Sequence, residues 1–140
     1  MSSMSRNVVQ SNLRNNLRQI TDLLENMIST EEDIFINMMR VSNISRQHRQ
    51  MTRRLEQMYE RLQRIDRLMN AYIAVVVHQV SPHIQSRRIQ QAYRLFRDAN
   101  IWQQYPGIIR TERQRLTDLS ERLDDLRSQV RNSIFRLRSL

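Results

Sequence analysis

The sequence predicts an all-α protein made of long amphipathic helices, with an N-terminal helical arm and a small antiparallel helix bundle. Its 140 residues include one Gly and two Pro, too few turn formers for a protein of many strands. Apolar residues recur at three- and four-residue spacing along most of the chain. We expect the arm to span residues 1–54 and the bundle residues 55–140.

The first helix is expected at about residues 5–28. Ser29 and Glu32 have the spacing of a capping box, which predicts a helix end near Met27 and a new start near Glu31. The next helix, at about residues 31–80, is either continuous or bent at the short polar side chains of residues 42–45. A heptad pattern that begins at Leu17 supports both helices; its more regular row is Ile20, Met27, Ile34, Val41, His48, Leu55, Leu62, Met69 and Val76.

The β-branched segment Ala71–Val77 is interpreted as the buried end of that helix rather than as a strand, because it continues the same row. Ser81-Pro82 predicts a break, with Ser81 capping a shorter helix at about residues 82–99. Tyr105-Pro106-Gly107 is the clearest turn. It leads into a long helix from Ile108 to about Leu137.

This last helix has the most regular apolar row of the chain, and Trp102 precedes it as a further anchor. We expect these residues to form an interface between subunits: Leu116, Leu119, Leu123, Leu126, Val130, Leu137 and Trp102. The aromatic residues around the two prolines are interpreted as core packing, with base stacking as the less favoured alternative; they are Tyr72, Tyr93, Phe96, Trp102 and Tyr105.

Charge gives the strongest chemical signal. All 23 basic residues are Arg, and with 14 acidic residues the formal net charge is +9. The acidic residues are unevenly spread, because four segments contain none: residues 1–21, 34–55, 67–97 and 126–140. Arginines without acidic neighbours on their own helix must face water, the acidic residues of another helix, or a polyanion.

Nucleic acid is the favoured polyanion, because Arg binds phosphate through a planar fork and each neutralised phosphate releases counterions. The expected phosphate contacts are Arg6, Arg14, Arg18, Arg40, Arg46, Arg49, Arg53 and Arg54, with Arg87 and Arg88 as a second group. Pairing between helices is the alternative. In that case the acidic residues of the last helix would neutralise an arginine row of another helix; they are Glu112, Asp118, Glu121, Asp124 and Asp125.

Other classes of function are not supported. The single Gly rules out a glycine-rich phosphate loop, and the absence of Cys rules out thiol chemistry and a zinc ribbon. The spacing of His78 and His83 does not suit a metal site on one helix. We therefore expect no enzyme activity, cofactor, metal or small-molecule substrate. We also expect no transmembrane helix. The apolar rows of the helices suit protein partners better than a membrane surface.

A small, Lys-free, helical chain with arginine rows and a polar N-terminal arm resembles the major coat proteins of filamentous archaeal double-stranded DNA viruses. The resemblance is one of layout and composition. In that family the arm lies against DNA held in A-form, the bundle forms the outer wall, and two related subunits often pair. The resemblance implies an arm at Ser5–Arg54 and a bundle at Leu55–Leu140.

The sequence-based hypothesis is thus a coat subunit of a virion that wraps double-stranded DNA without base preference. It would assemble with itself or with a paralogous coat subunit. The residues do not distinguish DNA from RNA. Outside a virion we expect an intracellular, soluble protein. The alternative is a helical coiled-coil scaffold or adaptor that binds no nucleic acid.

Overall fold

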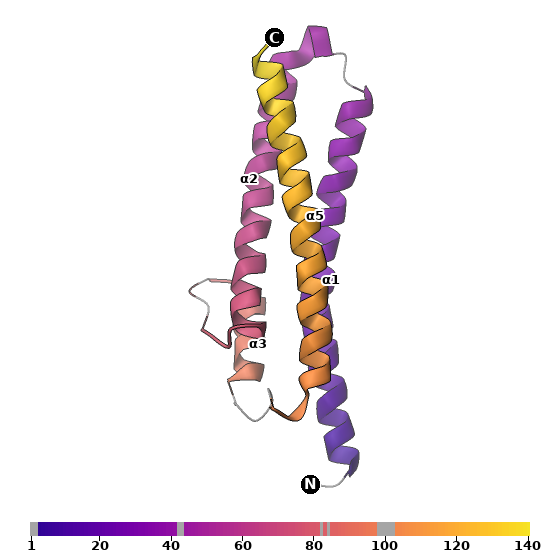
Figure 1. Ribbon diagram of the computed structural model, residues 1–140, viewed down its shortest axis with the longest axis vertical. Coiled ribbons are helices and arrows are strands. Elements are labelled where there is room, and N and C mark those ends of the chain that lie inside the picture. The colour runs from indigo at the N-terminus through magenta and orange to yellow at the C-terminus, as the bar shows by residue number, and fades with distance from the viewer. Residues whose placement is uncertain (1–2, 42–43, 82, 84, 98–102) are drawn as a thin grey trace.

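The computed structural model describes residues 3–41, 44–81, 83, 85–97 and 103–140, apart from the side chains of residues 3–6, 41 and 44–47. The regular structure in these ranges is helical, which confirms the all-α prediction. The helices are α1 (Ser3–Val41), α2 (Ile44–Val76), α3 (Arg87–Phe96) and α5 (Pro106–Arg138). Three of them are long and lie side by side as a rod, in which α2 runs opposite to α1 and α5 (Figure 1). The short α3 packs against α2 and α1 near the end that holds the N-terminus.

Each long helix buries one apolar row against the other two, and the three rows form a single core. This burial is the main source of stability in such a bundle. On α1 the row is Leu13, Leu17, Ile20, Leu24, Ile28 and Phe35. On α2 it includes Met51, Leu55, Met58, Leu62, Ile65, Met69, Tyr72 and Val76. On α5 it includes Ile109, Leu116, Leu119, Leu123, Leu126, Val130, Ile134 and Leu137.

The predicted helix break near residue 29 is wrong, because α1 continues from Ser3 to Val41. The side chains that suggested a cap have other partners. Ser29 accepts a hydrogen bond from Arg122 at 3.0 Å, and Glu32 accepts one from the same guanidinium at 2.6 Å. Of the two alternatives for residues 31–80, the one with a bend at residues 42–45 agrees with the structure, since α1 ends at Val41 and α2 begins at Ile44.

The segment Ala71–Val77 is helical as expected, to within one residue of the end of α2. The next break comes earlier than Ser81, because Gln79 takes a left-handed conformation with φ of 55°. The helix α3 then begins at Arg87, and its N-cap is Ser86, whose hydroxyl accepts from the Ile89 N–H at 3.4 Å. Pro82 lies outside the described residues.

The long last helix is confirmed and begins at Pro106, which occupies its first turn. The expected boundary between arm and bundle at residues 54 and 55 lies inside α2. The core also takes side chains from α1, so α1 is packed into the bundle from Leu13 onward and is not a separate arm there.

The row that we expected to join subunits lies inside this chain. Leu116, Leu119, Leu123, Leu126, Val130 and Leu137 are all buried against α1 and α2. Near its end the buried row includes Ile134, while Ser133 is half-buried. This row therefore offers no surface to a second copy. Trp102, expected to act with it, lies outside the described residues.

The interpretation of the aromatic residues as core holds for Tyr72, Phe96 and Tyr105, which are buried, and Tyr93 packs half-buried against the same core.

We expect Leu123→Ala to destabilise the monomer by about 2–5 kcal/mol, the usual cost of truncating a fully buried leucine. Chemical denaturation of the purified protein measures this change. Leu140→Ala is the matched control, because Leu140 is 77% exposed and should cost little. Equal unfolding free energies for Leu123→Ala and the wild type would contradict this packing of α5.

Candidate nucleic-acid interface

Arginines of α5 bind carboxylates of α1 in the middle of the rod. The Arg115 guanidinium donates to the Thr21 hydroxyl at 2.8 Å, to the Glu25 carboxylate at 2.6 Å and to the Asp22 carboxylate. Two helical turns further along α5, Arg122 binds Glu32 of α1. Burial lowers the pKa of Arg115, but its bonds to Asp22 and Glu25 outweigh this and leave its pKa raised.

The remaining ion pairs between helices also use carboxylates of α1 and α2. Arg61 binds Glu31 at 2.9 Å, and Arg138 binds Glu56. Arg127 lies 3.6 Å from Asp66 and 5.9 Å from the centre of the Tyr59 ring. Pairing between helices is therefore real, but it runs opposite to the expected direction, because α5 mainly supplies the arginines.

The acidic residues of α5 do not neutralise an arginine row of another helix within the described part of the chain. Asp118, Glu121, Asp124 and Asp125 are exposed. Asp124 lies 3.5 Å from Arg127 of its own helix, and Asp118 accepts a bond from Gln114 at 3.1 Å. The expected arginine rows are left to face water or another molecule.

The four acid-free segments come together in pairs at the two ends of the rod. Residues 34–55 and 126–140 meet where α1 turns into α2 and α5 ends, which we call the hairpin end (Figure 1). Residues 1–21 and 67–97 meet at the opposite end, beside α3, which we call the α3 end. Most carboxylates thus lie in the middle of the rod.

Arginines dominate the surface of the hairpin end. Within the described residues the following are exposed and make no ion pair: Arg40, Arg49, Arg53, Arg54, Arg131 and Arg136. Arg49 and Arg53 lie one turn apart, on the face of α2 opposite its buried row. Arg131 and Arg136 were not among the expected phosphate contacts, although the acid-free segment 126–140 contains them.

The α3 end is also basic. Its exposed arginines without an ion pair in the described residues are Arg14, Arg18, Arg87, Arg88, Arg94, Arg97 and Arg110. Arg113 donates to the Val77 carbonyl at 3.3 Å. The predicted phosphate contacts are therefore divided between two ends rather than gathered on one arm. The side chains of Arg6 and Arg46 lie outside the described residues.

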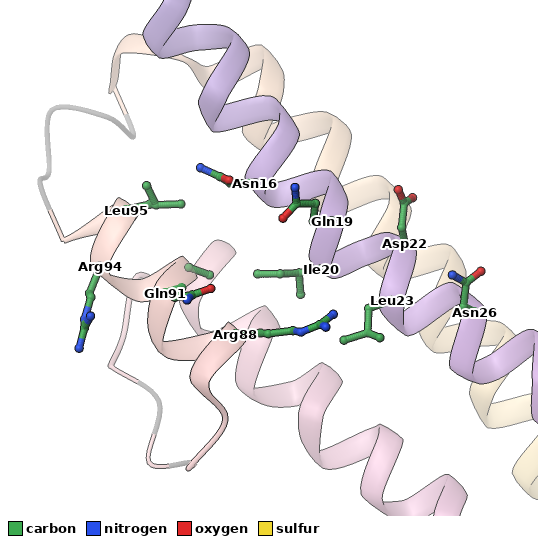
Figure 2. Close-up of a pocket in the computed structure, with 11 residues that line it drawn as sticks. Asn16, Gln19, Ile20, Asp22, Leu23, Asn26, Arg88, Gln91, Arg94 and Leu95 are labelled. Carbon is green, nitrogen blue, oxygen red and sulfur yellow. The ribbon is translucent and has the colours of Figure 1, made fainter.

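A groove of about 810 Å³ separates α1 from α3 at the α3 end. Its walls mix apolar and amide side chains, including Asn16, Ile20 and Gln91. In Figure 2 the Arg88 side chain extends across the groove toward Ile20 and Leu23, whereas Arg94 points away from it. Of the expected phosphate contacts, Arg88 is thus the one whose side chain lies in this groove.

A buried polar cluster lies next to this end and joins the three long helices. The Tyr72 hydroxyl donates to the Leu17 carbonyl at 3.2 Å. Glu112 is only 4% exposed, and its Oε2 atom has no hydrogen-bond partner in the described residues. Burial raises the pKa of Glu112 above its ordinary value, against the opposing effects of Thr21, Arg115 and Arg18. The pKa of Tyr72 is also raised, mainly by burial and secondly by the charge of Glu112.

Within the described residues, no three carboxylate or histidine side chains gather closely enough to hold a metal ion. No helix in the described ranges has the length and apolar content needed to cross a bilayer. Comparison with protein-family models, curated proteins and solved structures finds no significant match to this chain.

The raised pKa of Glu112 makes the stability of the fold depend on pH. Between the pKa of unfolded Glu, about 4.3, and the raised value, the folded state binds more protons, so the free energy of unfolding falls as pH rises. We expect Glu112→Gln to remove this contribution. Relative to the wild type, the variant should gain stability from about pH 4 upward.

Denaturant unfolding at a series of pH values measures this difference. Glu121→Gln is the matched control, because Glu121 is an exposed carboxylate of the same helix with no ion pair in the described residues. Parallel pH profiles for Glu112→Gln and the wild type would show that burial does not raise the pKa of Glu112.

Proposed function

We propose that this protein is a structural DNA-packaging protein, a coat or nucleocapsid subunit that binds double-stranded DNA through the arginines of its two ends. One observation carries the proposal: the four acid-free segments converge in pairs, and their exposed arginines, apart from Arg138, make no ion pair within the described residues. The available carboxylates are bound elsewhere or lie in the middle of the rod.

Clustered arginines of one sign repel one another, so each end gains free energy when a polyanion neutralises it. Phosphate suits these ends because guanidinium forms charge-assisted, often bidentate bonds with it. Contacts of this kind go to the backbone of the duplex and carry no base preference. The first phosphate contacts are proposed at Arg40, Arg49, Arg53, Arg54, Arg131 and Arg136, with Arg14, Arg18, Arg87 and Arg88 at the α3 end.

The shape of the rod supports packaging rather than a single encounter with DNA. A helix the length of α2 or α5 spans about 50 Å at 1.5 Å per residue, so the two basic ends are too far apart to bind the same few phosphates. One subunit is proposed to bridge two stretches of duplex. Successive subunits would neutralise a long DNA and hold its turns together.

The salt dependence of binding tests the site assignment. We expect Arg49→Gln combined with Arg53→Gln to weaken duplex binding and to reduce the slope of log affinity against log salt by about 1.8, since each lost phosphate contact contributes about 0.9. Fluorescence anisotropy with duplexes of unrelated sequence measures both quantities.

Arg64→Gln, compared with Arg53→Gln alone, is the matched control on the same helix. Arg64 is exposed and makes no ion pair in the described residues, but it lies between Glu60 and Asp66, outside the acid-free segments. If the control lowers the slope as much as the end variant does, the phosphates do not bind at the hairpin end. If neither variant changes the slope, the proposed contacts are wrong.

Assembly is tested by negative-stain microscopy of the protein with and without linear duplex DNA. The packaging proposal predicts regular filaments or coated rods that require DNA. Discrete particles of the same size in both samples would instead favour the scaffold alternative. In that alternative the arginines at the ends would bind acidic residues of another protein.

A further inference from the structure

The most exposed aromatic side chain in the described residues lies within the hairpin end. Phe135 is 74% exposed, although the adjacent Ile134 is buried in the core. Arg131, four residues before Phe135, and Arg138, three residues after it, lie on the same face of α5. The ring therefore stands on the outer side of the bundle with one arginine on each side of it along the helix.

This placement does not serve the fold. A single exposed apolar residue is ordinary on a protein surface. Here, however, the ring lies between guanidinium groups in a segment without an acidic side chain, residues 126–140. Arg131 makes no ion pair in the described residues, and only Arg138 is partly neutralised, by Glu56. A partner that fits this face must offer negative charge and an apolar surface within a few ångströms of each other.

We infer that Phe135 is a wedge that inserts between base pairs of bound duplex DNA while Arg131 and Arg138 contact the flanking phosphates. Nucleic acid offers both features, since stacked bases have flat apolar faces and a charged backbone runs beside them. A sulfated polysaccharide offers the charge without the faces. The inference rests on the proposed function and adds to it a mode of contact that phosphate binding alone does not require.

An anionic membrane is the other partner with charge beside an apolar phase, and the composition of this face disfavours it. Helices that lie on bilayers bury a continuous apolar face. The residues around Phe135 on the outer side of α5 are polar instead, among them Ser128, Asn132 and Ser139, all of which are exposed. One ring in a polar surface suits a local insertion better than adsorption along the helix.

A wedge has a geometric consequence for DNA. Apolar side chains inserted between base steps partly unstack them and kink the duplex, which exposes more of it to the protein. A coat subunit that kinks DNA at each contact would help the duplex follow the curved path that packaging needs. Arginine contacts set the salt dependence of binding and the inserted ring causes the bend, so salt slope and bending separate the two roles.

The experiment compares the full-length wild type with Phe135→Ala on a short duplex labelled at both ends, by anisotropy and by energy transfer between the labels. We expect wild-type protein to shorten the distance between the labels. Phe135→Ala should lose this shortening and bind roughly tenfold more weakly, as stacking contacts usually contribute. Its salt slope and its binding to heparin should stay unchanged, because no charge is removed.

Two further variants serve as a control and as a direct reporter of ring insertion. Leu140→Ala removes a comparably exposed apolar side chain from the same end and should leave bending intact. Phe135→Trp in a Trp102→Phe background places the only indole of the chain at the wedge. Its fluorescence should fall when duplex DNA is added and should not respond to heparin.

The outcomes separate the inference from the proposed function. If wild type and Phe135→Ala bind and bend DNA equally, the wedge is overturned while arginine-based packaging stands. If the wild type binds no duplex, both fail, and loss of sedimentation with anionic phospholipid vesicles in Phe135→Ala would assign this face to a membrane. If Phe135→Ala instead converts an oligomer into a monomer without changing DNA bending, the face joins two copies of this chain and the wedge is overturned.

Discussion

Carboxylates are fewer than arginines in this chain, and their position along the rod determines the rest of its charge distribution. The bonds of Arg115 and Arg122 to the carboxylates of α1, and of Arg61 to Glu31, hold the acidic residues in the middle of the bundle. Exposed ion pairs of this kind contribute little stability, usually below about 1 kcal/mol each. Their larger effect is on register, because sliding one helix by a turn would separate several pairs at once.

Stability comes instead from the three apolar rows, and the buried polar cluster limits how they can pack. Tyr72, Thr21 and Glu112 come from different long helices and meet around Arg115. A polar group buried without its partner costs about 1–3 kcal/mol, so alternative registers that separate this cluster are disfavoured. Glu112 carries part of that cost even in the native register, since its Oε2 has no partner in the described residues.

The two ends of the rod have the opposite character to its middle. Both ends have an excess of arginine. The hairpin end also has the exposed ring of Phe135 on the outer side of α5. Such ends remain apart in solution because like charges repel, and a polyanion that neutralises them would bring them together. In the proposed function, assembly and DNA binding are therefore one process, in which the ends contact phosphate.

Spacing and composition are local properties, and they were enough to predict the helical class, the long last helix, the helical end of α2 near Val76 and the excess of arginine. The partners of these features depend on how the helices pack. Ser29 and Glu32 have the spacing of a helix cap, yet they bind an arginine 90 or more residues away, and no local pattern reveals such a partner. A periodic apolar row shows that a face is buried but not which chain covers it, so the leucines of α5 were expected at an interface and lie in the core. The acid-free segments are visible in the sequence, but their meeting at two ends follows from the path of α2, which runs antiparallel to α1 and α5.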